Sequence, residues 1–241
     1  MRHWKLIIII CVMGACAKPV STKSSGVVSR SFSISQAMED LLVDEASLAD
    51  DELGYGIEYM KKDANGALLA LHMDRRFFLK EVPASIEALQ SLTSFRHDRV
   101  YNLSALPAGF FKLGNLTAVG FAHNEFTHIS PQFIQLQRLE TIDFAYNNLT
   151  EIPEFLANLP QLQVIYWGGN PLKQIPDFLR NDCSLRILDL HSTPELQVQA
   201  EQVEWFAKCH RLERLVLPVH LQHYEIRLSE LLPENCELEF E

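Results

Sequence analysis

Two segments of the chain carry a histidine and an aspartate two residues apart, a spacing that could in principle hold a metal ion. His72 and Asp74 form one pair, and Asp189 and His191 form the other. On a β-strand such side chains point to the same face. A zinc site, however, takes three or four protein ligands, and each pair offers only two. We therefore predict neither a metal site nor another cofactor, and we interpret both pairs as solvated surface groups.

Other signatures of catalysis are missing from the sequence. It contains no GxSxG, HExxH or CxxC motif and no glycine-rich phosphate loop that opens a helix. The formal net charge of -10 disfavours contact with phosphate backbones, so nucleic acid is not an expected partner. The sequence thus predicts a protein that is not an enzyme. Enzymatic activity is the remote alternative to the binding or structural functions that other features of the chain favour.

The first fifteen residues have the order of a secretory signal, because Arg2 and Lys5 precede an apolar run that is too short to span a bilayer as a helix. The run ends in Met13-Gly14-Ala15-Cys16, which resembles the lipobox of bacterial lipoproteins. This resemblance implies that residues 1–15 are a signal peptide and that acyl chains on Cys16 anchor the protein in a membrane. Ala17 stands where an inner-membrane retention signal has Asp, which favours the outer membrane. A plain secretory signal with an incidental cysteine is the alternative.

Leucines recur at a constant interval through the middle of the chain. Leu116, Leu139, Leu162 and Leu185 are each 23 residues apart, with matching Asn and Ile-Pro positions between them. The pattern LxxLxLxxNxLxxIPxxLxxL resembles that of bacterial leucine-rich-repeat proteins. The resemblance implies about seven units over residues 67–220. The expected fold is α/β, a curved solenoid with short parallel strands on its concave face.

Three further segments surround the repeats. Residues 16–35 are rich in serine and are interpreted as a flexible tether. Residues 36–66 are interpreted as an N-terminal helical cap, because apolar residues near 38–48 keep helical spacing. Residues 221–241 are interpreted as a C-terminal cap with a helix to Leu232 and a last strand.

The register of the repeats separates structural residues from exposed ones. In the family that the chain resembles, the Asn amide bonds to the backbone of adjacent turns, which implies a structural ladder made of Asn124, Asn147 and Asn170. Aromatic residues in one column are turned into the core by the alternation of the strand. They are Phe121, Phe144 and Trp167, and His97 falls in the same inward column as a tolerated polar residue.

The concave face is the expected binding surface. Asp143, Tyr146, Tyr166, Asp189 and His191 come from three consecutive units and point outward in this register. Tyrosines suit a protein interface, and the carboxylates suit a basic partner. We therefore predict a lipid-anchored module that binds a protein or an envelope polymer, and a structural envelope lipoprotein without a discrete ligand is the alternative.

Three cysteines lie in the C-terminal third of the chain, at positions 183, 209 and 236. Cys183 and Cys209 precede the first leucine of adjacent units by similar distances, so they are expected near each other at one edge of the solenoid. A disulfide and a pair of free thiols both remain open from the sequence. At least one of the three cysteines has no partner among the other two.

Overall fold

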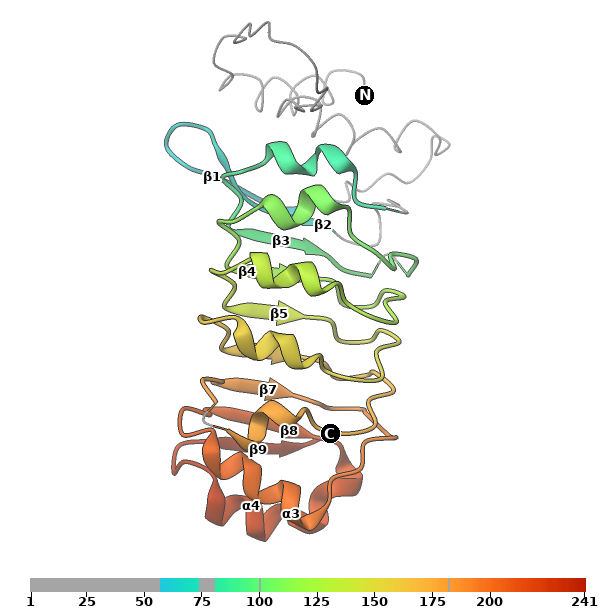
Figure 1. Cartoon of the computed structure of the whole chain (residues 1–241), viewed down its shortest axis with the longest axis vertical. Helices are drawn as coiled ribbons and strands as arrows, with labels where there is room; N and C mark the ends of the chain where they lie inside the picture. The colour runs from blue at the N-terminus through green and yellow to red at the C-terminus, as the bar shows by residue number, and fades with distance from the viewer. Residues whose placement is uncertain (1–56, 74–80, 100, 182) are drawn as a thin grey trace, which may run out of the picture.

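The computed structural model describes residues 57–73, 81–99, 101–181 and 183–241. Its strands form one nine-stranded sheet in which every strand lies beside its neighbours in the sequence. Figure 1 shows these strands stacked one above another along the long axis of the molecule, with short helices beside the stack. None of the helices in the described ranges is long and apolar enough to cross a membrane.

The strands are short and repeat with the leucine interval. Strands β2 to β9 run parallel and in register, whereas β1 pairs antiparallel with β2. Equivalent residues of successive units therefore form straight columns across the sheet. The strands are β1 (Ile57–Lys62), β2 (Leu68–Met73), β3 (Ser94–His97), β4 (Ala118–Gly120), β5 (Thr141–Asp143), β6 (Val164–Tyr166), β7 (Ile187–Asp189), β8 (Arg214–Leu217) and β9 (Glu237–Phe240).

Each unit returns through a short 3₁₀ helix, and a proline often stands immediately before it. Pro153 and Pro176, for example, occupy the N-cap with extended backbone, which suits the fixed φ of proline. The helical elements are η2 (Ala84–Ala88), η3 (Ala108–Lys112), η4 (Pro131–Gln135), η5 (Glu154–Asn158), η6 (Asp177–Arg180), α3 (Ala200–Val203), η7 (Glu204–Lys208), η8 (Val219–Tyr224) and α4 (Glu225–Leu231).

One continuous apolar core fills the space between the sheet and these helices. Its central column contains Phe121, Phe144 and Trp167, and Phe95 packs against Phe121 from the neighbouring column; all four rings are fully buried. Ring centroids lie 5.9 Å apart between Phe95 and Phe121, and 5.3 and 5.6 Å apart along the column, within the range of favourable aromatic contacts. The inward orientation predicted for Phe121, Phe144 and Trp167 is therefore what the structure shows.

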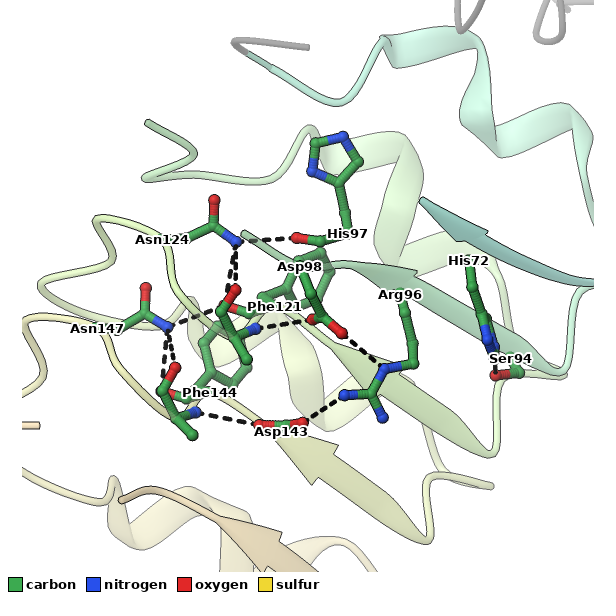
Figure 2. Close-up of polar contacts among 12 residues, drawn as sticks. His72, Ser94, Arg96, His97, Asp98, Phe121, Asn124, Asp143, Phe144 and Asn147 are labelled. Atoms are coloured by element: carbon green, nitrogen blue, oxygen red, sulfur yellow. Dashed lines mark hydrogen bonds and ion pairs between the residues drawn. The ribbon is translucent and has the colours of Figure 1, made fainter. Parts of the chain in front are cut away.

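The asparagine side chains connect each turn to the one before it (Figure 2). Asn147 donates from Nδ2 to the carbonyls of Phe121 and Phe144 at 2.9 and 3.0 Å, and its Oδ1 accepts the N–H of Phe126 at 3.0 Å. Asn124 and Asn170 repeat this arrangement one unit earlier and one unit later. Because a buried N–H or carbonyl without a partner is costly, these amides hold the turns in place.

The described structure begins with a β-hairpin at its N-terminal end. Ile57–Lys62, the part of residues 36–66 that forms an element in the described structure, is strand β1 and not a helix. It forms a hairpin with β2 through a turn at Asp63, whose carboxylate accepts the N–H groups of Asn65 and Ala67. Pairing with β2 satisfies one side of the β1 backbone. The predicted helix near 36–48 lies outside the described residues.

The C-terminal end continues the sheet. Helix α4 and strand β9 occupy the segment expected to hold a helix and a last strand, and β9 pairs in parallel with β8. Cys183 and Cys209 form a disulfide with a Cα–Cα distance of 4.8 Å, and Cys236 is free. Of the two possibilities that the sequence left open for Cys183 and Cys209, the structure has the disulfide.

Candidate binding surface on the concave face

A hollow of about 680 Å³ lies on the concave face, the side of the sheet that faces away from the apolar core. All five residues predicted for partner binding line it, so the parallel register brings them to one place. The hollow is lined by His72, Arg96, Asp98, Arg99, Ala122, His123, Asp143, Ala145, Tyr146, Tyr166, Asp189 and His191.

An arginine crosses the hollow at its N-terminal end (Figure 2). The Nε of Arg96 donates to Asp98 at 2.8 Å and its Nη2 donates to Asp143 at 2.5 Å, so one guanidinium bridges two carboxylates. Arg96 lies on β3 and Asp143 on β5, so the side chain must pass over β4. The outward residue of β4 is Gly120, and a Cβ there would lie 2.8 Å from the Arg96 Nε. Glycine at this position therefore allows the ion pair to form.

The electrostatics of this bridge follow from its partial enclosure. Burial raises the pKa of Asp143, and the positive charge of Arg96 opposes that rise. Burial by itself lowers the pKa of Arg96, but the charges of Asp98 and Asp143 outweigh it and the net shift is upward. Asp143 is thus both buried and ion-paired with Arg96.

Four rings from four units form a row along the strand ends. Tyr101 meets His123 edge-on, His123 stacks on Tyr146 with centroids 4.3 Å apart and planes 5° apart, and Tyr146 meets His191 edge-on at 5.3 Å. Burial, and to a smaller extent the positive charge of Arg99, lowers the pKa of His123. The neutral form of this ring is therefore favoured in the stack. We call Tyr101, His123, Tyr146 and His191 the ring row.

Polar contacts fix the C-terminal end of the ring row. The hydroxyl of Tyr146 lies 2.9 Å from Nε2 of His191, whose Nδ1 lies 2.6 Å from Oδ1 of Asp189. Two glycines of the intervening unit make room for this contact, because a Cβ on Gly168 would collide with the His191 ring and one on Gly169 with the Tyr146 ring. Gly120 and the Gly168-Gly169 pair thus serve the same purpose at the two ends of the hollow.

The backbone is left-handed at three of the four residues of the ring row. Tyr101, His123 and Tyr146 have φ values of 61°, 55° and 55°, and Gly169 has 69°. Each of these residues directly precedes the buried asparagine of its unit, or Asn102 in the first case. Residues other than glycine rarely adopt this backbone conformation. The hydrogen bonds made by the asparagine that follows each ring residue offset the strain. By holding these turns in place, the asparagine ladder also fixes the positions of the rings that precede it.

The two outward aspartates of the central strands are held by their own turns. Oδ1 of Asp143 accepts the N–H of Ala145 at 3.1 Å, and Oδ1 of Asp189 accepts the N–H of His191 at 3.0 Å. Tyr166 occupies the same column between them, since it is in register with Asp143 on one side and Asp189 on the other. The hollow therefore offers carboxylates on both sides of an outward tyrosine.

Among the described residues, no group of three or more His, Cys, Asp or Glu side chains lies close enough to hold a metal ion. His72 has its Nε2 2.8 Å from Oγ of Ser94, and Asp74 lies outside the described residues. Asp189 and His191 bond to each other and to Tyr146, which makes them part of the ring row's support.

His97 is turned into the core, as its register predicts. The ring is fully buried, stacks in parallel with Phe95, and neither of its nitrogens has a hydrogen-bond partner. Burial lowers the pKa of His97 to about 4. It contributes no side-chain group to the hollow.

The sequence analysis did not identify the residues that allow contacts between units that are not adjacent. Arg96, Gly168 and Gly169 are not among the site residues that the sequence predicted. A glycine in an outward column is the signal that could have identified them, because its missing side chain lets the neighbouring units touch. That signal exists for Gly120 between Arg96 and Asp143.

Comparison with known proteins supports this description of the fold. A family model described as "Leucine rich repeat" matches residues 114–172. No curated protein sequence matches the chain. Among solved structures, the leucine-rich-repeat domain of the type III effector XopL is 19% identical, with a TM-score of 0.57 over 72% of this chain and 69% of that one.

A plant ice-binding protein is similar to the same extent, with 19% identity and a TM-score of 0.57 over 85% of this chain and 74% of that one. At such low identity these likenesses concern the fold alone. Together with the repeats, the parallel sheet and the family match over residues 114–172, they show that the chain has the α/β solenoid fold of leucine-rich-repeat proteins.

Proposed function

We propose that this protein is a lipid-anchored binding module that takes a protein partner in the hollow of its concave face. The observation that carries the proposal is the exposure of the ring row. Tyr146 is 42% exposed and Tyr101 is 59% exposed, although the aromatic residues of the core column are fully buried. Large aromatic side chains that stay accessible in a rigid setting are typical of interface hot spots.

The surroundings of the rings also support binding. Tyr146 is held by a stacked ring and a hydrogen bond, so little side-chain entropy remains to be lost when a partner docks. Solenoids of this kind offer extended concave surfaces to other proteins. The choice of a protein partner rests on the mixture of aromatic, cationic and carboxylate groups around one hollow.

The lipid anchor and the outer-membrane location rest on the sequence, since Cys16 lies outside the described residues. Mass spectrometry of the mature N-terminus tests them. We expect a chain that begins at Cys16 with its acyl modification, and loss of that modification and of membrane retention in the Cys16→Ala variant. An unmodified N-terminus at another position, with unchanged location of the variant, contradicts the anchor.

The binding surface is tested by cross-linked capture from envelope and extracellular extracts. A partner captured by the wild-type protein should be lost from the Tyr146→Ala/Tyr166→Ala double variant and retained by Ile226→Ala, which removes an exposed apolar residue on α4 instead. Thermal unfolding of each variant is measured in parallel to verify that it folds. A partner that binds the double tyrosine variant with full affinity places the interface elsewhere.

A further inference from the structure

The hollow contains a guanidinium binding arrangement that is filled at one end only. At the N-terminal end the side chain of Arg96 lies between Asp98 and Asp143 and bonds to both. At the C-terminal end the carboxylates of Asp143 and Asp189 flank Tyr166, but no cation of the described residues bonds to Asp189 in the same way. The chain therefore supplies its own arginine to the first pair of carboxylates and not to the second.

We infer that the second position receives an arginine side chain from the partner, stacked on Tyr166 and bonded to Asp189. This inference rests on the proposed function, because it assigns a chemistry to the partner of the same hollow. Arginine fits better than lysine, since its planar guanidinium can stack on an aromatic ring and bond to a carboxylate at once.

Asp189 has the acceptor capacity that such a contact needs. Its Oδ1 accepts from the backbone N–H and the ring Nδ1 of His191. Within the described structure its Oδ2 makes no hydrogen bond. The two bonds to Oδ1 fix the orientation of the carboxylate, so the second oxygen is presented without a large entropy loss on binding.

Nearby cations of the chain are already committed. Arg214 on β8 lies close enough for its charge to act on Asp189, yet its guanidinium donates to both carboxylate oxygens of Glu239 at 3.0 and 2.9 Å. Arg96 is held by Asp98 and Asp143. Neither side chain is free to neutralise Asp189.

The charge of the surrounding face has the sign that an arginine requires. From β5 to β9 the outward positions at the strands and strand ends carry one arginine and five carboxylates. They are Asp143, Asp189, Arg214, Glu237, Glu239 and Glu241. Such a surface attracts a basic segment and repels an acidic one, which favours a basic protein partner over an acidic polymer.

The test uses N-acetyl-arginine amide as the probe and N-acetyl-citrulline amide as its uncharged counterpart of the same shape. Each is titrated into the ¹⁵N-labelled protein in detergent micelles while backbone amide shifts are followed by NMR. We expect the arginine probe to shift the amides of Tyr166 and His191, and the citrulline probe to leave them nearly unchanged. Added salt should weaken the arginine effect.

Two variants sharpen the result. Asp189→Asn removes the charge but keeps an oxygen that can accept the N–H of His191. This variant should bind the arginine probe about threefold to tenfold more weakly than the wild-type protein does. Glu213→Gln removes an exposed carboxylate that does not line the hollow, and it should bind the probe as the wild type does. Equal shifts with citrulline and arginine, equal affinity in Asp189→Asn, or no shift at Tyr166 and His191 each overturn the inference.

This inference and the proposed function can fail separately. If the arginine probe leaves the hollow unchanged while a captured partner is lost from the double tyrosine variant, the hollow binds a partner but not through an arginine. If the probe binds while the partner is retained by that variant, the arginine site is real and the partner docks elsewhere. The comparison of the two probes on the wild-type protein needs no variant to fold.

Discussion

The central repeats and the C-terminal repeats belong to one sheet but are connected by different groups. In units β4 to β6 a buried asparagine bonds to the backbone of its own turn and of the preceding one. In unit β7 the same position holds Thr193, whose hydroxyl donates only to Leu190 of its own unit. The Cys183–Cys209 disulfide joins the adjacent units there.

Surface ion pairs also connect the units at the C-terminal end. Arg186–Glu213, Arg214–Glu239 and Arg227–Glu204 each join neighbouring units in the C-terminal part of the chain. The difference shows what an asparagine supplies that a threonine does not. Its amide has two N–H donors and a separate acceptor oxygen, so it bonds to carbonyls of two turns and to one N–H, whereas the single hydroxyl hydrogen of Thr193 satisfies one carbonyl.

The largest expected effect comes from the disulfide. Its cysteines are 26 residues apart, and opening a loop of this size should lower the free energy of unfolding by about 3 kcal/mol. Urea unfolding of the Cys183→Ala/Cys209→Ala double variant measures this loss. A reductant should destabilise the wild-type protein and the Cys236→Ala control, which keeps the disulfide, but should not affect the double variant. Equal stability of wild type and double variant would contradict a stabilising disulfide.

The next effect concerns the asparagine ladder. Asn147→Ala leaves the buried N–H of Phe126 without its partner and removes the bond that the Phe121 carbonyl accepts from the next turn, so we expect a loss of about 2 kcal/mol. Thr193→Val removes a single bond, for which about 1 kcal/mol is expected. Chemical denaturation measures both, and Asn148→Ala at an exposed neighbouring position should have no effect. If Thr193→Val proved as damaging as Asn147→Ala, the two regions would not differ as described.

A smaller and pH-dependent effect is expected at His97, where the central column of rings begins. Burial lowers its pKa from 6.5 to about 4, so the unfolded chain takes up a proton at a higher pH than the folded one. Stability is therefore lost as the pH falls from about 6.5 toward 4, with about 1 kcal/mol lost between pH 7 and pH 5.5.

The His97→Phe variant tests this linkage, because phenylalanine occupies the equivalent positions 121 and 144. Its free energy of unfolding should depend less on pH than that of the wild-type protein in this window. The exposed His210→Gln variant should keep the wild-type dependence. Parallel pH profiles of the wild-type and His97→Phe proteins would show that His97 does not titrate as described.

The smallest expected effect is that of the surface ion pairs at the C-terminal end. Arg186 and Glu213 are both about half exposed, so solvent and salt screen their attraction. Arg186→Gln should leave the unfolding midpoint unchanged within the error of a calorimetric measurement. A clear loss at low salt that disappears at high salt would mean that ion pairs contribute to this region together with the disulfide.

Much of the architecture could be predicted because the repeat is periodic. The interval between leucines places Phe144 inward and Tyr166 outward, since a strand alternates its side chains and every unit stacks in the same register. The same register groups Asp143, Tyr166 and Asp189 on one face. The sequence could not predict strand β1, because a single strand of six residues without a repeat partner carries too little periodic signal.

What the sequence determined by itself is therefore everything that depends on position within the unit: the core column, the turn asparagines and the outward face. What only the tertiary structure decided depends on contacts between units that are not adjacent. Arg96 reaches Asp143 and Tyr146 reaches His191 because Gly120, Gly168 and Gly169 leave space between them. Such contacts join residues more than 40 positions apart in the sequence. They depend on how far a side chain reaches over the unit next to its own, and a repeat pattern does not encode that distance.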